Sequence, residues 1–250
     1  MPKIPDLLLR AFPLLQKNQA HVWSCDLDGA PESEYSVSAD ERQRAARFHF
    51  ERDQTRFLRG RGVLRLLLAR YLNASPEDLE FEINAHGKPE LRNNVNENSQ
   101  KLRFNISHSQ NRALLAFGWD FDIGVDIEFQ RDDFDVEKIA KLAARFFTKK
   151  ESRQLSTLDA AAMRTAFFQL WTRKESLLKA VGTGVSGGLS HFEISVLPQE
   201  KPRVLAPKHE ADDWRLFDLE VQPEYSGALA VKAKSANEYS VYQLQIPGEL

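Results

Sequence analysis

The sequence has few of the features that mark membrane, secreted or cysteine-rich proteins. It contains one cysteine, Cys25, in 250 residues, so it can form neither an internal disulfide nor a cysteine-based zinc site. Arg65 and Arg70 interrupt the longest apolar run, which therefore falls short of a membrane span. The first sixteen residues lack the continuous apolar stretch of a signal peptide. We therefore expect a soluble, cytoplasmic protein in a reducing compartment.

Charge of one sign is not in excess either. The 34 Lys and Arg against 36 Asp and Glu leave a net charge of −2, whereas proteins held to nucleic acid or anionic lipid by bulk charge carry a surplus of Lys and Arg. Hydrophobic residues make up 42% of the chain and charged residues 28%, which is typical of a globular domain rather than a disordered segment. We expect no nucleic-acid partner and no membrane partner.

The sequence has no long Pro-rich or Gly/Ser-rich linker, so any two domains must be tightly joined. A faint internal repeat is present, because Ala-Ala-Arg-Phe occurs at 45–48 and again at 143–146. The pattern predicts two similar α+β halves, 1–122 and 123–250. Periodicity predicts helices at 54–72, 135–146 and 160–181, and strands at 79–83, 103–106, 112–119, 123–129, 192–196, 214–221, 228–233 and 241–246.

The segment Gly-Val-Asp-Ile-Glu at 124–128 carries two carboxylates at strand spacing. Side chains two apart in a strand share a face, so Asp126 and Glu128 lie side by side while Val125 and Ile127 enter the core. Two adjacent carboxylates repel each other unless a cation lies between them, and oxygen ligands of this kind suit Mg²⁺. A strand with a polar, solvated outer face would show the same pattern.

The predicted helix at 160–181 carries Glu175 and Lys179, which are four residues apart and share a helical face. Such a pair is often only an exposed ion pair of small stabilising effect. Together with the carboxylates at 126 and 128, however, Glu175 could complete a metal shell. Lys179 could then neutralise a phosphate that the metal bridges.

Two further residues are candidates for chemistry. His108 follows a predicted strand, within a Ser-His-Ser turn at 107–109; there it could be structural, a base or a phosphate donor. Thr148 has the features of a helix N-cap, with Glu151 at the capping-box position. That structural role explains both residues, and a general-base role for Glu151 is an additional hypothesis.

Positive charge is concentrated between residues 40 and 70, which hold nine Arg and four acidic residues. Guanidinium groups match phosphate oxygens in pairs, so an anionic ligand is expected to bind there. A solvated helix face is the alternative for several of these arginines. The Gly-rich segment at 182–188 lacks the Lys-Ser/Thr ending of a P-loop and follows a helix instead of preceding one, so it is interpreted as a helix stop.

The order of these motifs resembles the 4′-phosphopantetheinyl transferases of the surfactin-synthetase-activating type. The resemblance covers about 42–194. It implies a pseudo-two-fold α+β enzyme with its active site in the cleft between the halves, acting as a monomer. Such an enzyme transfers the 4′-phosphopantetheine of coenzyme A to a serine of an apo acyl or peptidyl carrier protein and releases adenosine 3′,5′-bisphosphate. The motifs are HGKPEL at 86–91, FNISHS at 104–109, GVDIE at 124–128, RFFTKKE at 145–151 and WTRKESLLKA at 171–180.

The resemblance also implies roles for individual residues. Asp126, Glu128 and Glu175 would hold Mg²⁺ against the pyrophosphate. The second half would thus carry the metal and catalytic motifs, and the first would bind the adenine and 3′-phosphate. Glu41 stands where relatives can have a lysine. The implied catalytic residues are His108 on a phosphate, Lys179 on the α-phosphate and leaving group, and Glu151 on the carrier serine; those implied for coenzyme A binding are Arg42, Arg44, Arg56, Gly87, Lys88, Pro89, Ser107, His108, Lys174 and Lys179.

Two other classes fit part of the pattern. A metal-dependent nuclease also combines Asp, Glu and Lys around Mg²⁺, although the near-neutral charge argues against it. A non-catalytic module that binds coenzyme A or a carrier protein would keep the fold without the reaction. Neither the carrier protein nor its pathway follows from the residues.

Overall fold

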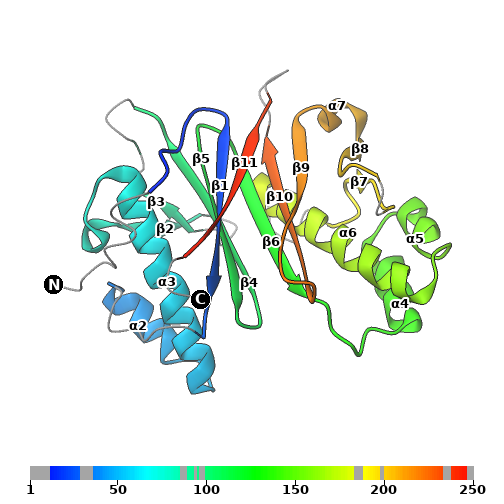
Figure 1. Ribbon diagram of the computed structural model, residues 1–250, viewed down its shortest axis with the longest axis horizontal. Helices are drawn as coiled ribbons and strands as arrows, with labels where there is room; N and C mark the ends of the chain where they lie inside the picture. Colours follow the sequence, from blue (N-terminus) through cyan, green and yellow to red (C-terminus); the bar gives the residue numbers. More distant parts are fainter. Residues whose placement is uncertain are drawn as a thin grey trace.

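Two β-sheets stand side by side in the middle of the molecule, and a long helix covers the outer face of each (Figure 1). The computed structural model describes residues 12–28, 36–84, 89–92, 95, 99–182, 188–197, 200–232 and 238–246. The layers follow the order helix, sheet, sheet, helix. This mixed architecture confirms the predicted α+β class.

The first sheet has the strand order β11-β1-β5-β4, and helix α3 covers it. Its last strand comes from the end of the chain and pairs in parallel with β1. This sheet therefore combines strands from both predicted halves, because β11 lies after residue 122 and the other three strands lie before it. The elements are β1 (Gln19–Asp26), α3 (Glu51–Leu72), β4 (Leu102–Ser109), β5 (Arg112–Trp119) and β11 (Ser240–Gln245).

The second sheet has the order β6-β10-β9 and packs against helix α6. The periodicity at 160–181 predicted α6 with its observed bounds, and Gly182 ends the helix in the left-handed conformation that glycine favours. Helix α4 begins at Val136, one residue after the predicted start, because Asp135 is its N-cap. The elements are β6 (Ile123–Phe129), α4 (Val136–Phe146), α5 (Lys149–Leu155), α6 (Ala160–Val181), β9 (Trp214–Leu219) and β10 (Tyr225–Lys232).

Side chains along the strands of the first sheet point alternately into two hydrophobic cores, one beneath α3 and one between the two sheets. In β1, Trp23 and Cys25 pack under α3, whereas Ala20 and Val22 face the second sheet. Val125 belongs to the same inter-sheet core, which confirms the predicted inward orientation of that residue. Burying one face against a helix and the other against a sheet is what joins the halves.

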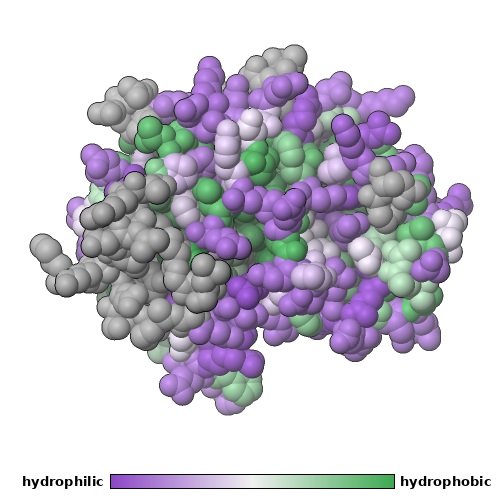
Figure 2. All heavy atoms as spheres, viewed as in Figure 1, coloured by the Kyte–Doolittle hydropathy of each residue, from purple (hydrophilic) through white to green (hydrophobic). Residues whose placement is uncertain are grey.

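Short elements complete the fold. The strand predicted at 192–196 is present as the two-residue strand Glu193–Ile194, and it pairs beside α6 with a strand at Val204–Ala206 that was not predicted. No helix in the described ranges is long and apolar enough to cross a bilayer. Hydrophilic residues cover most of the face in Figure 2. The remaining elements are α2 (Ala39–Ala45), η2 (Pro76–Asp78), β2 (Phe81–Ile83), β3 (Pro89–Leu91), β7 (Glu193–Ile194), β8 (Val204–Ala206) and α7 (Lys208–Ala211).

One local prediction near the site is wrong. The segment 107–109 was expected to form a turn, but β4 continues through Ser109 and the chain reverses at Gln110, whose φ is 52°. Strand pairing with β5 extends from Leu102 to Ser109 and overrides the weak strand propensity of Ser and His. His108 therefore projects from a strand and not from a loop.

Candidate active site

Asp126 is the most constrained acidic residue of the site. It lies on β6 with 3% of its surface exposed. Its Oδ1 atom accepts hydrogen bonds from Lys179 Nζ at 2.6 Å and from Ser107 Oγ at 2.8 Å, whereas its buried Oδ2 has no hydrogen-bond partner. Burial raises the pKa of Asp126, although the Lys179 charge and both hydrogen bonds act against that rise. The loss of hydration at the buried Oδ2 is thus not compensated by any hydrogen bond.

Gly124 brings helix α6 close to this carboxylate. A Cβ atom at position 124 would lie 2.1 Å from the Ser176 carbonyl oxygen and 2.4 Å from the Ala180 nitrogen. Any side chain would therefore push α6 away from β6. Because Glu175 and Lys179 flank that contact on α6, the glycine is what allows them to approach Asp126.

The three predicted metal ligands influence one another electrostatically. Burial raises the pKa of Glu128, and the Asp126 charge raises it further. Burial likewise raises the pKa of Glu175, with added contributions from Asp126 and Glu128. Mutual repulsion of this kind is relieved by a cation between the carboxylates.

The described residues contain no group of three or more His, Cys, Asp or Glu side chains already arranged to hold a metal ion. The orphaned Oδ2 atom of Asp126 and the repulsion from Glu128 and Glu175 nevertheless fit a divalent cation, because hard oxygen donors without other partners are what Mg²⁺ takes. The donor set fits, but its three members are not preassembled.

A pocket of about 720 Å³ opens beside α3, and all its lining residues lie between 27 and 113. Five arginines line it. Arg56 pairs with Asp28 through two hydrogen bonds of 2.6 and 2.7 Å, and Arg92 pairs with Glu80 at 2.8 Å. Arg44 is the lining arginine for which no described residue supplies a carboxylate, and its guanidinium lies 5.5 Å from the Phe57 ring centre.

The other two arginines of the pocket, Arg61 and Arg65, both pair with Glu41. Its Oε1 accepts from Arg61 Nε at 2.6 Å and its Oε2 from Arg65 Nε at 2.7 Å. It also closes the capping box of α2 with Ser38. Glu41 is thus an internal partner of two arginines. These charges lower the pKa of Glu41 despite the opposing effect of its burial.

His108 and Ser107 are neighbours on β4, and their side chains point to opposite faces of the strand. His108 lines the pocket, whereas Ser107 contacts both Asp126 and Lys179. Burial lowers the pKa of His108, and the charges of Lys179 and Arg56 lower it further. The neutral imidazole is therefore favoured, which allows it to donate or accept one hydrogen bond at each nitrogen.

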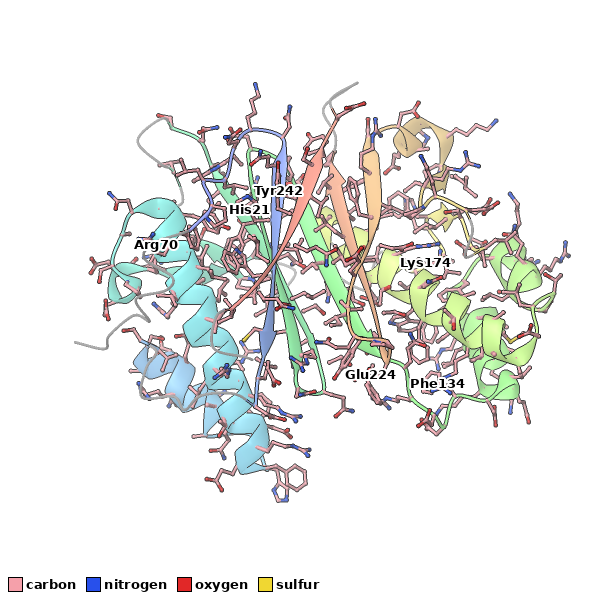
Figure 3. All side chains as sticks on the ribbon, viewed as in Figure 1. His21, Arg70, Phe134, Lys174, Glu224 and Tyr242 are labelled. Atoms are coloured by element: carbon pink, nitrogen blue, oxygen red, sulfur yellow. The ribbon has the colours of Figure 1, made fainter. Side chains whose placement is uncertain are left out.

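Glu151 and Lys174 do not have the positions that their predicted roles require. Glu151 is 0% exposed and Lys174 1% exposed, and their side chains form an ion pair at 2.8 Å. Lys174, which projects from α6 (Figure 3), also donates through Nζ to the carbonyl oxygens of Leu189 and Phe192. Because both groups are buried and paired with each other, the structure indicates structural positions for Glu151 and Lys174 rather than contacts with a carrier serine or a coenzyme A phosphate.

The remaining predicted ligand contacts divide into three groups. Pro89 lines the pocket, as does Arg56, although Asp28 already occupies that guanidinium. Arg42 is exposed and does not line the pocket. Gly87 and Lys88 lie outside the described residues.

Sequence reasoning missed two polar residues of the site. Asn105 and Ser109 flank Ser107 at strand spacing and contact β6, through Val125 N at 2.9 Å and Glu128 Oε2 at 3.0 Å. Their signal was the alternation of polar residues at 105, 107 and 109, which is evident only if 107–109 is assigned to a strand. The turn expected at 107–109 interrupted that alternation in the prediction.

Two family models match successive parts of the chain. A model described as the 4′-phosphopantetheinyl transferase superfamily matches residues 122–232, and one described as 4′-phosphopantetheinyl transferase, N-terminal, matches residues 23–118. The 4′-phosphopantetheinyl transferase HetI of Nostoc sp. is 36% identical over 236 residues, 92% of each chain. The 4′-phosphopantetheinyl transferase ffp of Bacillus subtilis is 31% identical over 194 residues, 77% of this chain and 81% of the other.

Identity at this level over nearly the whole of a relative, together with matches to both halves, is decisive for family membership. The chain belongs to the 4′-phosphopantetheinyl transferase superfamily and is an enzyme of that class.

Proposed function

We propose that the protein transfers the 4′-phosphopantetheine moiety of coenzyme A to a serine of an apo acyl or peptidyl carrier protein. The observation that carries this proposal is the Asp126 carboxylate, which pairs with Lys179 through one oxygen and keeps the other open. A pocket lined by arginines and by His108 lies on the other face of the same strand, one residue from the Ser107 that binds this carboxylate. A diphosphate that joins a nucleotide to an extended arm suits such a junction of cations and metal-type ligands.

Within this proposal the nucleotide of coenzyme A occupies the pocket beside α3. Arg44 binds the 3′-phosphate, because each of the other four lining arginines already pairs with a carboxylate. Phe57 and Pro89 offer apolar surface to the adenine. The pyrophosphate then extends past His108 toward Asp126.

The oxygens of Asp126, Glu128 and Glu175 would hold Mg²⁺, which supplies charge neutralisation for the pyrophosphate when bound. Lys179 complements these carboxylates, since its side chain is 30% exposed and its ammonium pairs with Oδ1 of Asp126, which leaves Oδ2 for the cation. Neutral His108 donates a hydrogen bond to a phosphate oxygen.

The proposed reaction forms a bond between the serine oxygen and the phosphorus that carries the pantetheine arm. It breaks the bond from that phosphorus to the bridging oxygen of the pyrophosphate, and the electron pair leaves on adenosine 3′,5′-bisphosphate. The serine proton passes to solvent water. Lys179 stabilises the negative charge that develops on the leaving phosphate, because its ammonium can stay paired to Asp126 while it contacts that oxygen.

Two finer features also belong to the proposal. The halves 1–122 and 123–250 are related by a pseudo-two-fold arrangement around the active-site cleft, which is supported by one long helix over each sheet. The protein is a cytoplasmic monomer of the surfactin-synthetase-activating type. Support for the type comes from the 30–31% identity to the transferases psf-1 of Bacillus pumilus and ffp of Bacillus subtilis.

Mass spectrometry of the product tests the proposed activity. The purified protein is incubated with coenzyme A, Mg²⁺ and a panel of apo acyl and peptidyl carrier proteins. We expect a carrier to gain the mass of one phosphopantetheine arm and adenosine 3′,5′-bisphosphate to appear in equal amount. A panel that stays unmodified while a known transferase modifies it would overturn the proposal, and omission of Mg²⁺ separates the metal requirement from the activity.

A further inference from the structure

Strands β4 and β6 meet through side chains instead of backbone pairing. Both strands lie wholly within the described residues, yet they belong to separate sheets, each as an edge strand. Asn105, Ser107 and Ser109 on β4 point across the gap. They bind Val125 N, Asp126 Oδ1 and Glu128 Oε2, at 2.9, 2.8 and 3.0 Å.

This row of side chains satisfies the open edge of β6. Amides on the outer edge of a sheet need acceptors once water is excluded. The Val125 amide donates to Asn105 Oδ1, and the Phe129 amide donates to Ser109 Oγ at 3.1 Å. The first half of the chain therefore sets the position of β6 by hydrogen bonds spaced along the strand.

Ser109 differs from the other two members because it bonds to a side chain and a backbone group at once. The Ser109 hydroxyl donates a hydrogen bond to Glu128 Oε2, and its oxygen accepts one from the backbone amide of Phe129, the residue after Glu128. Both bonds together fix where the hydroxyl points. The carboxylate of Glu128 is held by an atom from the other half of the protein.

We propose that Ser109 is a positioning residue that holds Glu128 for the divalent cation across the junction of the two halves. The inference rests on the proposed function, in which Glu128 is a metal ligand. Hydrogen-bonded partners of metal ligands commonly govern metal affinity, and their loss weakens it by about 10-fold to 100-fold. Ser109 itself contacts neither the coenzyme pocket nor Asp126 in the described contacts.

The test compares Ser109→Ala with a matched control, Ser195→Ala. Ser195 is also a serine that donates to one oxygen, Lys201 O, and accepts from one amide, Arg203 N, each at 3.0 Å. Its side chain contacts none of the three acidic residues. Ser109→Thr retains the hydroxyl and serves as the rescue variant.

Two readouts are measured on each full-length protein. Mn²⁺ binding is followed by electron paramagnetic resonance, since Mn²⁺ accepts the same oxygen ligands. The Mg²⁺ concentration for half-maximal transfer is measured at saturating coenzyme A. We expect Ser109→Ala to weaken both by about 10-fold or more, Ser109→Thr to recover most of that loss, and Ser195→Ala to leave both unchanged even if its melting temperature falls.

Equal metal affinity in Ser109→Ala and wild type would overturn the inference, as would an equal loss in Ser195→Ala. Absence of transfer by the wild-type protein would count against the proposed function instead. In that case the Mn²⁺ titration alone decides whether Ser109 positions Glu128.

Discussion

Lys179 Nζ lies 2.6 Å from Asp126 Oδ1, and this ion pair joins helix α6 to strand β6 at the point where Gly124 lets them touch. Lys179 also donates to Ser107 Oγ on β4 at 2.8 Å. Three elements from both halves thus converge on one ammonium group. The chemistry of the site depends on that convergence.

Replacement of Asp126 by Asn should abolish most of the transfer activity while the protein stays folded. The amide removes a negatively charged metal ligand, and loss of such a group costs at least about 100-fold in rate. The rate is measured by mass spectrometry and the fold by thermal denaturation. Asp133→Asn is the control, because Asp133 is an exposed partner of Lys138 and should not affect the rate. Wild-type turnover by Asp126→Asn would contradict the metal assignment.

Substitution of Lys179 by Ala should lower kcat even at saturating coenzyme A, by about 100-fold, because its charge is needed most when the leaving phosphate becomes more negative. Steady-state kinetics separate kcat from KM. Lys141→Ala removes an exposed lysine paired with Glu137 and should have no effect. If only the KM for coenzyme A rose in Lys179→Ala, Lys179 would bind the substrate without stabilising the transition state.

The buried pair of Glu151 and Lys174 should prove structural. Glu151→Gln leaves the Lys174 ammonium buried without its counter-ion, which costs about 3–5 kcal/mol of unfolding free energy. Burial already lowers the pKa of Lys174, and Glu151 opposes that effect. Urea denaturation measures the loss. At a temperature where Glu151→Gln remains folded, kcat should stay within a few-fold of wild type, whereas a catalytic base would lose far more.

Arg44→Ala should raise the KM for coenzyme A by about 10-fold or more, since a charge-assisted hydrogen bond contributes about 1.5–3 kcal/mol. Arg56→Ala should have a smaller effect because Asp28 already holds that guanidinium. The comparison is made with coenzyme A and with 3′-dephospho-coenzyme A. An Arg44→Ala defect of the same size with both substrates would show that Arg44 does not bind the 3′-phosphate.

His21 should make the protein sensitive to mild acid. It is 1% exposed and lies near Tyr242 (Figure 3), and its Nδ1 lies 2.8 Å from Tyr71 Oη. Burial lowers the pKa of His21 from 6.5 to about 4. Because the folded pKa lies below the unfolded one, stability is full above pH 6.5 and falls as the pH approaches 4, by about 3 kcal/mol.

Urea denaturation from pH 7 to pH 4 measures this dependence for wild type and for His21→Gln. The variant should lose less stability over that interval, since its side chain does not titrate. Identical pH profiles for the two proteins would show that His21 is not responsible.

Local patterns accounted for the features that neighbouring residues control. The capping box of Thr148 and Glu151 is present with both of its hydrogen bonds, and Gly182 ends α6 as predicted. The alternation in 124–128 placed Val125 in the core and Asp126 on the opposite face. Caps and alternation depend on bonds within a few residues, which is why the order of residues alone predicts them.

The sequence by itself therefore determined the long helices, the local caps and the residue types that chemistry requires. Only the tertiary structure decided which charges are available. Glu151 pairs with Lys174 and accepts a hydrogen bond from the Ile194 amide, and Arg61 pairs with Glu41. Each of these contacts joins residues at least 20 positions apart. The physical reason is that burial and ion pairing depend on which elements pack together, and local spacing carries no record of that packing.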